Sequence, residues 1–133
     1  MPSLGELLHP LTLLAAACLL LNDLVLKRLH LGPSWLTGKL SDLAGIALFP
    51  LLLTGTWRTL RWAVGRPDTR LTATALGVAL AATAVGFATL KLSPAVARAA
   101  GAVQDPTDLV ALVMLIPAAW VGRREIGRGK TPP

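Results

Sequence analysis

The stretch of sequence that decides the fold is Thr37-Gly38-Lys39-Leu40-Ser41-Asp42-Leu43-Ala44-Gly45-Ile46-Ala47-Leu48-Phe49-Pro50, in which charged residues lead without a break into an apolar run. This run continues to Trp57. Because an α-helix rises about 1.5 Å per residue, a helix over 40–57 is long enough to cross most of a bilayer. Lys39 and Asp42 then lie at or inside one edge of the membrane. The stretch therefore predicts a membrane helix that begins in a charged site.

Composition indicates the class of protein. The chain has 133 residues, of which 53% are hydrophobic, and its mean hydropathy is +0.61. Its apolar residues come in long runs separated by basic loops, so we expect a polytopic membrane protein whose residues 1–133 form a single domain. The net charge of +6 comes mostly from Lys and Arg beside these runs. That position suits phospholipid headgroups, so membrane lipids rather than nucleic acid are the expected partners.

The apolar runs predict an all-α fold, a four-transmembrane-helix bundle. The expected helices cover residues 7–26, 40–57, 71–92 and 106–122. The first run has an alternative reading as a secretory or lipoprotein signal ending near Cys18. Its start has no Lys or Arg, however, and Leu19–Leu21 continue the run. We therefore expect a mature helix, with Cys18 as a small core residue that has no disulfide partner.

The distribution of basic residues predicts the orientation. With the N-terminus inside the cell, the inner segments carry eight Lys and Arg and the outer loops carry five. Basic residues concentrate on the cytoplasmic side of membrane proteins. We therefore expect a multi-pass protein of the cell membrane with both the N- and the C-terminus in the cytoplasm.

Two further patterns concern helix packing. Leu26-Lys27 followed by Ser41-Asp42-Leu43 has a counterpart in Leu90-Lys91 followed by Thr107-Asp108-Leu109. These matches suggest two parallel helical-hairpin repeats, with chance similarity as an equal alternative. Small residues also recur one turn apart in the third helix, which predicts a face where another helix packs closely. They are Ala73, Gly77 and Ala81.

The predicted topology brings a group of ionisable side chains to the external end of the bundle. The group consists of Asp23, Lys27, His30, Lys39, Asp42, Lys91, Asp105 and Asp108. Ionisable groups near the hydrocarbon boundary are costly unless they are paired or hydrated, so their concentration there marks a candidate functional site. The residues chosen as candidate ligand-binding residues are Asp23, Lys27, Lys39, Ser41, Asp42 and Asp108.

Helix capping is the competing explanation for several of these residues. Asp105-Pro106-Thr107-Asp108 has the pattern of a helix start, with an N-cap acid, a proline at the first position and a second acid near the positive end of the dipole. Capping is the expected role of Asp105. For Asp108, and for Ser41 and Asp42 in the second helix, capping and a role in the site are equal alternatives.

Asp23 is less easily explained, because a carboxylate near a helix C-terminus opposes the dipole. One alternative is an i,i+4 pair with Lys27 that needs no ligand. We predict instead that Asp23 and Asp42 face each other across the first helical hairpin, with Lys27 or Lys39 between them, because unpaired charges at that depth would be expelled. His30 is expected to be an uncommitted loop residue.

The sequence has no catalytic signature, whether a phosphate-binding glycine loop, a zinc-type His pair, a serine elbow or a CxxC motif. Acidic side chains at a membrane edge can hold a divalent cation that bridges to a phosphate, with Lys27 and Lys39 as direct partners. The leading hypothesis is therefore binding of an anionic lipid or lipid-linked headgroup, with or without a divalent cation.

Two other functions stay open. A small ion channel or proton-coupled transporter would use the same carboxylates, although only Thr54, Thr74 and Thr83 offer polar groups deeper in the membrane. A membrane enzyme acting on a lipid phosphate would need a base such as His30 or Asp23. The sequence predicts no particular oligomeric state.

The starts of the second and last helices carry a family resemblance. Gly38-Lys39-Leu40-Ser41-Asp42 and Thr107-Asp108-Leu109-Val110-Ala111 resemble the VanZ-like family of small four-helix bacterial membrane proteins, over about half the chain. The chain departs from that pattern: no His follows in the second helix, no Glu/Gln pair closes the third, and no Asn-x-x-Gly follows Asp108. The resemblance implies a role in the cell envelope, at the inner membrane, near lipid-linked precursors.

Overall fold

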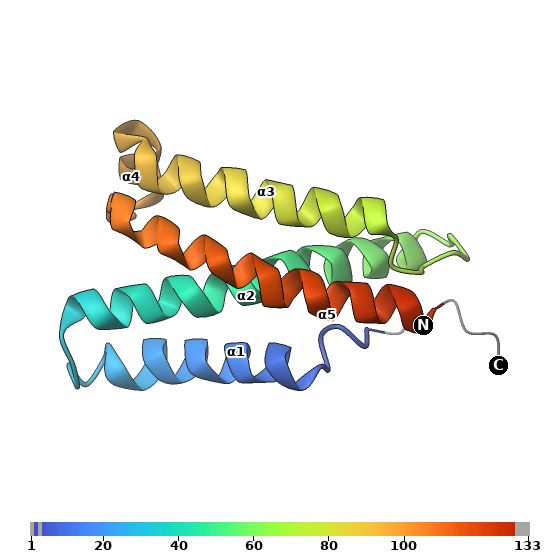
Figure 1. Ribbon diagram of the computed structural model, residues 1–133, viewed down its shortest axis with the longest axis horizontal. Coiled ribbons are helices and arrows are strands. Elements are labelled where there is room, and N and C mark those ends of the chain that lie inside the picture. Colours follow the sequence, from blue (N-terminus) through green and yellow to red (C-terminus); the bar gives the residue numbers. More distant parts are fainter. Residues whose placement is uncertain (1, 3, 130–133) are drawn as a thin grey trace.

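The computed structural model describes residues 2 and 4–129, and this part of the chain is helical without any strand. Its elements are α1 (Pro10–Leu21), the π-helical turn η1 (Asn22–Leu26), α2 (Ser34–Ala63), α3 (Ala73–Leu92), the short α4 (Pro94–Ala100), the 3-10 helix η2 (Pro106–Met114) and α5 (Leu115–Arg128). The predicted all-α class is confirmed. Figure 1 shows the long elements side by side, with the chain reversing direction from one to the next, so that both termini lie at one end.

The second helix is longer than the sequence suggested. It was expected over 40–57 and covers Ser34–Ala63, because Pro33 takes an extended N-cap conformation and the helix begins directly after it. At about 1.5 Å per residue, α2 is about 45 Å long, enough for a hydrocarbon core and both headgroup layers. Together with α3, it is one of two helices in the described chain that are long and apolar enough to cross a membrane, and Pro10–Leu26 is a shorter apolar helix.

The last predicted helix, 106–122, is built from two kinds of helix. It begins as the 3-10 helix η2 and continues as α5 to Arg128. A 3-10 helix rises about 2.0 Å per residue, so nine residues in this form extend the element by about 4–5 Å compared with an α-helix.

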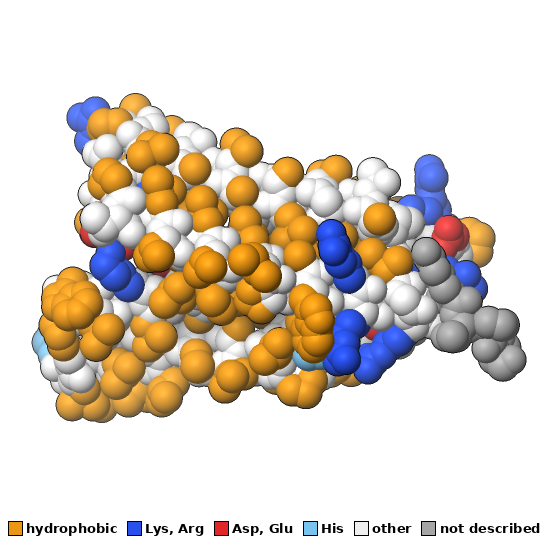
Figure 2. All heavy atoms as spheres, in the orientation of Figure 1, with side chains coloured by type: hydrophobic (Ala, Val, Ile, Leu, Met, Phe, Trp, Pro, Cys, Tyr) orange, Lys and Arg blue, Asp and Glu red, His pale blue; other side chains and the backbone are white. Residues whose placement is uncertain are grey.

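The core lies where α2 and α5 cross near the middle of the bundle. Leu51 of α2 packs with Ala118 and Val121 of α5, and Leu7 and Leu80 cover this cluster. Leu51 is 1% exposed. Most large apolar side chains outside this cluster point outward, and Figure 2 shows them covering the visible face, while Lys and Arg lie mostly toward its two ends. The bundle thus has a small core and a largely apolar surface.

The expected close-packing face of α3 is not the one that packs. Ala73, Gly77 and Ala81 are exposed, and a Cβ added at Gly77 would meet nothing within 4 Å. The packed face of α3 carries Leu76, and the close approach comes from Gly122 of α5 instead. A Cβ added at Gly122 would lie 2.5 Å from Leu76 Cδ1. The small residue that matters is therefore on the partner helix.

A buried ion pair joins the segment before α1 to the end of α2. Arg58 Nη1 lies 2.6 Å from Glu6 Oε1, and both residues are buried. Arg58 Nε also donates to the carbonyl oxygen of Thr69 at 2.6 Å, and the Thr12 hydroxyl donates to the Glu6 carbonyl at 2.6 Å. The pair therefore links three segments at the end of the bundle that carries the termini.

The contact between Gly122 and Leu76 predicts a difference between two glycines of α5. Gly122→Ala should lower the free energy of unfolding by about 1–3 kcal/mol, because the added methyl group overpacks the buried Leu76 side chain. Gly127→Ala, in the same helix with no atom within 4 Å of the new Cβ, should leave stability unchanged or raise it by up to about 1 kcal/mol. Unfolding of the detergent-solubilised variants, followed by circular dichroism, measures both effects. Equal effects of the two changes would contradict this packing.

Candidate functional site

Two polar networks lie at the end of the bundle opposite the termini. This end collects η1, the start of α2, the end of α3 and the start of η2 (Figure 1). The Lys91 network consists of Lys39, Asp42, Lys91, Asp105, Thr107 and Asp108. The Ser41 network consists of Asn22, Asp23, Lys27, Thr37 and Ser41. The alternation of chain direction therefore brings together residues that are far apart in the sequence.

Lys91 joins three elements. Its Nζ lies 2.8 Å from Asp42 Oδ2 on α2 and 2.7 Å from Asp108 Oδ2 on η2. The side chains of Lys91 and Asp108 are only 7% and 9% exposed. Charges buried to this extent are tolerated when they are paired, and each of these groups meets at least one opposite charge. Lys91 thus holds two carboxylates from different helices beside each other.

Lys39 forms the more exposed side of the same network. Its Nζ lies 2.7 Å from both Asp108 Oδ1 and the Thr107 hydroxyl, and 3.6 Å from Asp105 Oδ2. The hydroxyl and the backbone N–H of Thr107 both donate to Asp105 Oδ1, and these bonds hold the pKa of Asp105 below its usual range. Asp105 is a helix cap, as expected. Asp108 is more than a cap, because its two carboxylate oxygens form ion pairs with Lys39 and Lys91.

The Ser41 network connects η1 to α2. The Ser41 hydroxyl donates to Asp23 Oδ1 at 2.6 Å and accepts from Lys27 Nζ at 2.8 Å. Lys27 Nζ also lies 2.8 Å from Asp23 Oδ1, which is the i,i+4 pair that the sequence offered as one alternative. Ser41 therefore links the end of the first helical segment to the charged start of the second.

Asn22 supports this contact from the buried side of the helix pair. Its side chain is fully buried and its Nδ2 donates to the Thr37 carbonyl and to the Ser41 hydroxyl, both at 2.7 Å. The donation to a carbonyl fixes which side-chain atom is the nitrogen. Asn22 begins the π-helical turn η1, closed by the bond from the Lys27 N–H to the Asn22 carbonyl. Such turns often occur at functional sites.

All six candidate ligand-binding residues belong to these networks, but they are paired differently from the sequence-based expectation. Asp23 pairs with Lys27 and Ser41, whereas Asp42 pairs with Lys91. The expected arrangement, in which Asp23 and Asp42 face each other with a lysine between them, was therefore wrong. The spacing of residues within one hairpin could not show that a lysine from α3 forms the ion pair with Asp42.

The structure adds two residues of consequence to the candidate set. Lys91 was placed at the external end by its sequence position but was not selected as a ligand-binding residue. Asn22 is not among the predicted site residues. The sequence could have indicated both residues, since each is a polar side chain at the end of a long apolar run, where an unpaired polar group is costly.

His30 and a metal ion find less support in this geometry. His30 Nδ1 lies 2.9 Å from the Lys27 carbonyl within the same exposed loop, so its partner is local. Among the described residues, no three His, Cys, Asp or Glu side chains come together in a way that could hold a metal ion. The aspartates are instead engaged by lysines, which gives the two networks three positive and four negative side chains.

Comparison of the chain with protein-family models, with curated proteins and with solved structures found no match in any of the three. A nearly balanced set of lysines, carboxylates and hydroxyls at the end of an apolar bundle can bind a polar group that carries both acceptors and donors.

The Lys91 bridge predicts a large loss of stability on its removal. Lys91→Met should lower the free energy of unfolding by about 3–5 kcal/mol, because it leaves two neighbouring carboxylates without their buried partner. Lys27→Met removes a lysine whose side chain is 42% exposed and should cost at most about 1 kcal/mol. Adding Asp42→Asn to Lys91→Met should restore part of the loss. Chemical unfolding in detergent measures these values, and equal losses for the two lysines would contradict the bridging role.

Proposed function

We propose that the chain is a multi-pass protein of the cell membrane in which four elements cross the bilayer, namely α1 with η1, α2, α3, and η2 with α5. The spacing of charges supports this arrangement. Lys39 and Arg58 are about 28 Å apart along α2, and Lys91 lies about 27 Å along α3 from Ala73, the first residue of that helix, which follows Arg70 by three positions. Both separations match a hydrocarbon core about 30 Å thick. The charges then lie at the two edges of the membrane.

The basic end of the bundle supports a cytoplasmic location of both termini. The arginines at this end come from the end of α2, the α2–α3 connection and α5, and they are Arg58, Arg61, Arg66, Arg70, Arg123, Arg124 and Arg128. Basic residues of this density are typical of the cytoplasmic face. The two polar networks then lie at the external face.

For the external end we propose binding of an anionic lipid or lipid-linked headgroup. The observation that carries this proposal is the contrast among the three lysines. Lys91 is buried between two carboxylates, whereas the side chains of Lys27 and Lys39 are 42% and 29% exposed and lie beside the hydroxyls of Ser41 and Thr107. Exposed ammonium groups next to hydroxyls are suitable donors for phosphate oxygens.

The carboxylates define the rest of the headgroup. Because the aspartates already balance the lysines, a bare phosphate gains little net attraction from the site. Asp23 and Asp105 keep side chains that are 45% and 40% exposed, and they can accept hydrogen bonds from hydroxyl or amine groups attached to the phosphate. The proposed ligand therefore combines a phosphate with neighbouring donors, and the lysines take the place of a divalent cation.

The other two functions are less well supported by this geometry. In the interior between the two charged ends, the hydroxyls of Thr54 and Thr83 donate to carbonyls of their own helices. They offer little of a polar pathway for a channel or a proton-coupled transporter. An enzyme would need a base near the phosphate, but His30 contacts its own loop, and Asp23 is already paired with Lys27 and Ser41. The resemblance to the VanZ-like family would agree with a cell-envelope role and is kept as part of the proposal.

The orientation is tested by fusions to alkaline phosphatase, an enzyme that matures only outside the cytoplasm. A fusion after Arg128 should be inactive, because the basic end is expected inside. A fusion in the loop after Leu31 should be active and serves as the control for expression. An active fusion after Arg128 together with an inactive one after Leu31 would reverse the proposed orientation.

The headgroup site is tested by lipid retention in native mass spectrometry. Lys27→Ala with Lys39→Ala should lower retention of phosphatidylglycerol by at least about tenfold, since each charge-assisted bond is worth about 1.5–3 kcal/mol. The matched control is Arg28→Ala with Arg98→Ala, which removes the same charge at the same end without touching either network. Equal losses in the two variants would reject a specific site. An ion flux through proteoliposomes that only the lysine variant loses would favour transport instead.

A further inference from the structure

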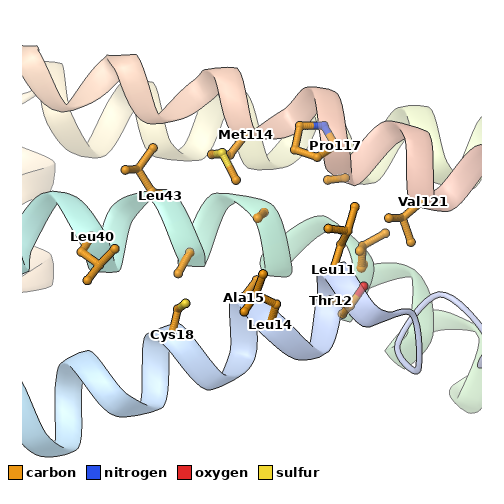
Figure 3. A pocket seen from close by; sticks show the side chains of 14 residues that line it. Leu11, Thr12, Leu14, Ala15, Cys18, Leu40, Leu43, Met114, Pro117 and Val121 are labelled. Carbon is orange, nitrogen blue, oxygen red and sulfur yellow. The ribbon is translucent and has the colours of Figure 1, made fainter.

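An apolar groove runs between α1, α2 and the η2–α5 element, along the helices. Figure 3 shows its lining side chains, with Leu40 and Leu43 at one end and Thr12 and Val121 at the other. Its volume is about 290 Å³, and its walls are leucine, alanine and other small or apolar residues apart from the Thr12 hydroxyl. That hydroxyl donates to the Glu6 carbonyl. The groove therefore offers shape and apolar surface, without a polar feature that would fix a water-soluble ligand.

The length of the groove corresponds to one leaflet of a bilayer. Along α2 it extends from Leu40 to Leu51, which is about 16 Å at 1.5 Å per residue. One half of a hydrocarbon core is about 15 Å thick. An apolar cavity of about 150 Å³ holds a benzene molecule, so the groove has room for a chain segment on the order of ten carbons.

The groove begins at the proposed headgroup site. Leu40, which lines its outer end, lies between Lys39 of the Lys91 network and Ser41 of the Ser41 network. Met114, which lines the opposite wall, is the last residue of η2, and the first turn of η2 carries Asp108. The polar end and the apolar groove are thus continuous along the same helices.

We propose that this groove holds one acyl chain of the lipid whose headgroup contacts Lys27 and Lys39, an inference that rests on the proposed function. A single hydrocarbon chain suits the space better than a helix does, because a helix with its side chains is about 10–12 Å wide. The chain lies parallel to α2, as chains in a leaflet do, and it covers Leu14, Cys18 and Leu43. The headgroup networks then select the lipid, while the groove fixes its depth and direction.

The probe for this proposal is phosphatidylglycerol with a diazirine in the middle of one acyl chain, incorporated at low fraction into nanodiscs with the full-length protein. After photolysis, the labelled peptides are identified by mass spectrometry. We expect label to concentrate in the three walls of the groove, 11–18, 40–51 and 114–121. Label spread evenly over the outward-facing residues of α3 would overturn the proposal.

A filled groove should lose this labelling. Ala15→Phe places a ring among the lining residues and should abolish the concentrated label, whereas Val85→Phe adds the same ring to an exposed position of α3 outside the groove and should leave it intact. Cys18, the only cysteine of the chain, gives a second readout that needs no core substitution. Alkylation of Cys18 by N-ethylmaleimide in detergent should be slowed by added phosphatidylglycerol. An unchanged rate would count against an acyl chain there.

The experiment separates the groove from the headgroup site. If Lys27→Ala with Lys39→Ala reduces lipid retention while the label in the wild type avoids the groove, the result supports the headgroup site and contradicts binding of an acyl chain in the groove. If a diazirine-labelled diacylglycerol, which lacks the phosphate, labels the groove equally well, the result supports binding of an acyl chain in the groove and contradicts selection of the lipid by its headgroup. Cys18–Cys18 disulfides formed by oxidation in nanodiscs would show that a second copy of the chain occupies the groove instead.

Discussion

The structure depends on the ion bridge from Lys91 to Asp42 and Asp108. A lysine near the end of an apolar helix needs a partner, and two carboxylates near one another need a cation between them. The bridge meets both needs and fixes α2, α3 and η2 relative to one another at one end. Because Asp108 is held in this way, its second oxygen is directed at Lys39. The more exposed part of the network is therefore positioned by its most buried part.

At the opposite end of the bundle, a second buried pair, Glu6 with Arg58, connects the segment before α1 to the end of α2. Between the two pairs the interior is small, and most of the large apolar side chains face outward. Such a surface is unfavourable in water and suits a hydrocarbon solvent, in which helices gain little from burying leucine. Specific polar pairs at the ends then contribute more to the register of the helices than an extensive core would.

The sequence by itself determined the helical class and the separation of charges. Long apolar runs favour helices, because a backbone surrounded by apolar groups must satisfy its own hydrogen bonds. The pattern Asp105-Pro106-Thr107 fixed a cap, because capping depends only on neighbours along the chain. The same locality explains why the i,i+4 pair of Asp23 and Lys27 could be offered from spacing alone.

Only the tertiary structure decided which charges meet. Lys91 reaches Asp42 across 49 positions of sequence, and no periodicity along one helix specifies the rotation of another helix beside it. The packed face of α3 was misjudged for the same reason, since the close approach depends on Gly122 of α5 and not on the small residues of α3 itself. Partners across helices are set by the crossing and rotation of whole elements, which the sum of many weak contacts determines.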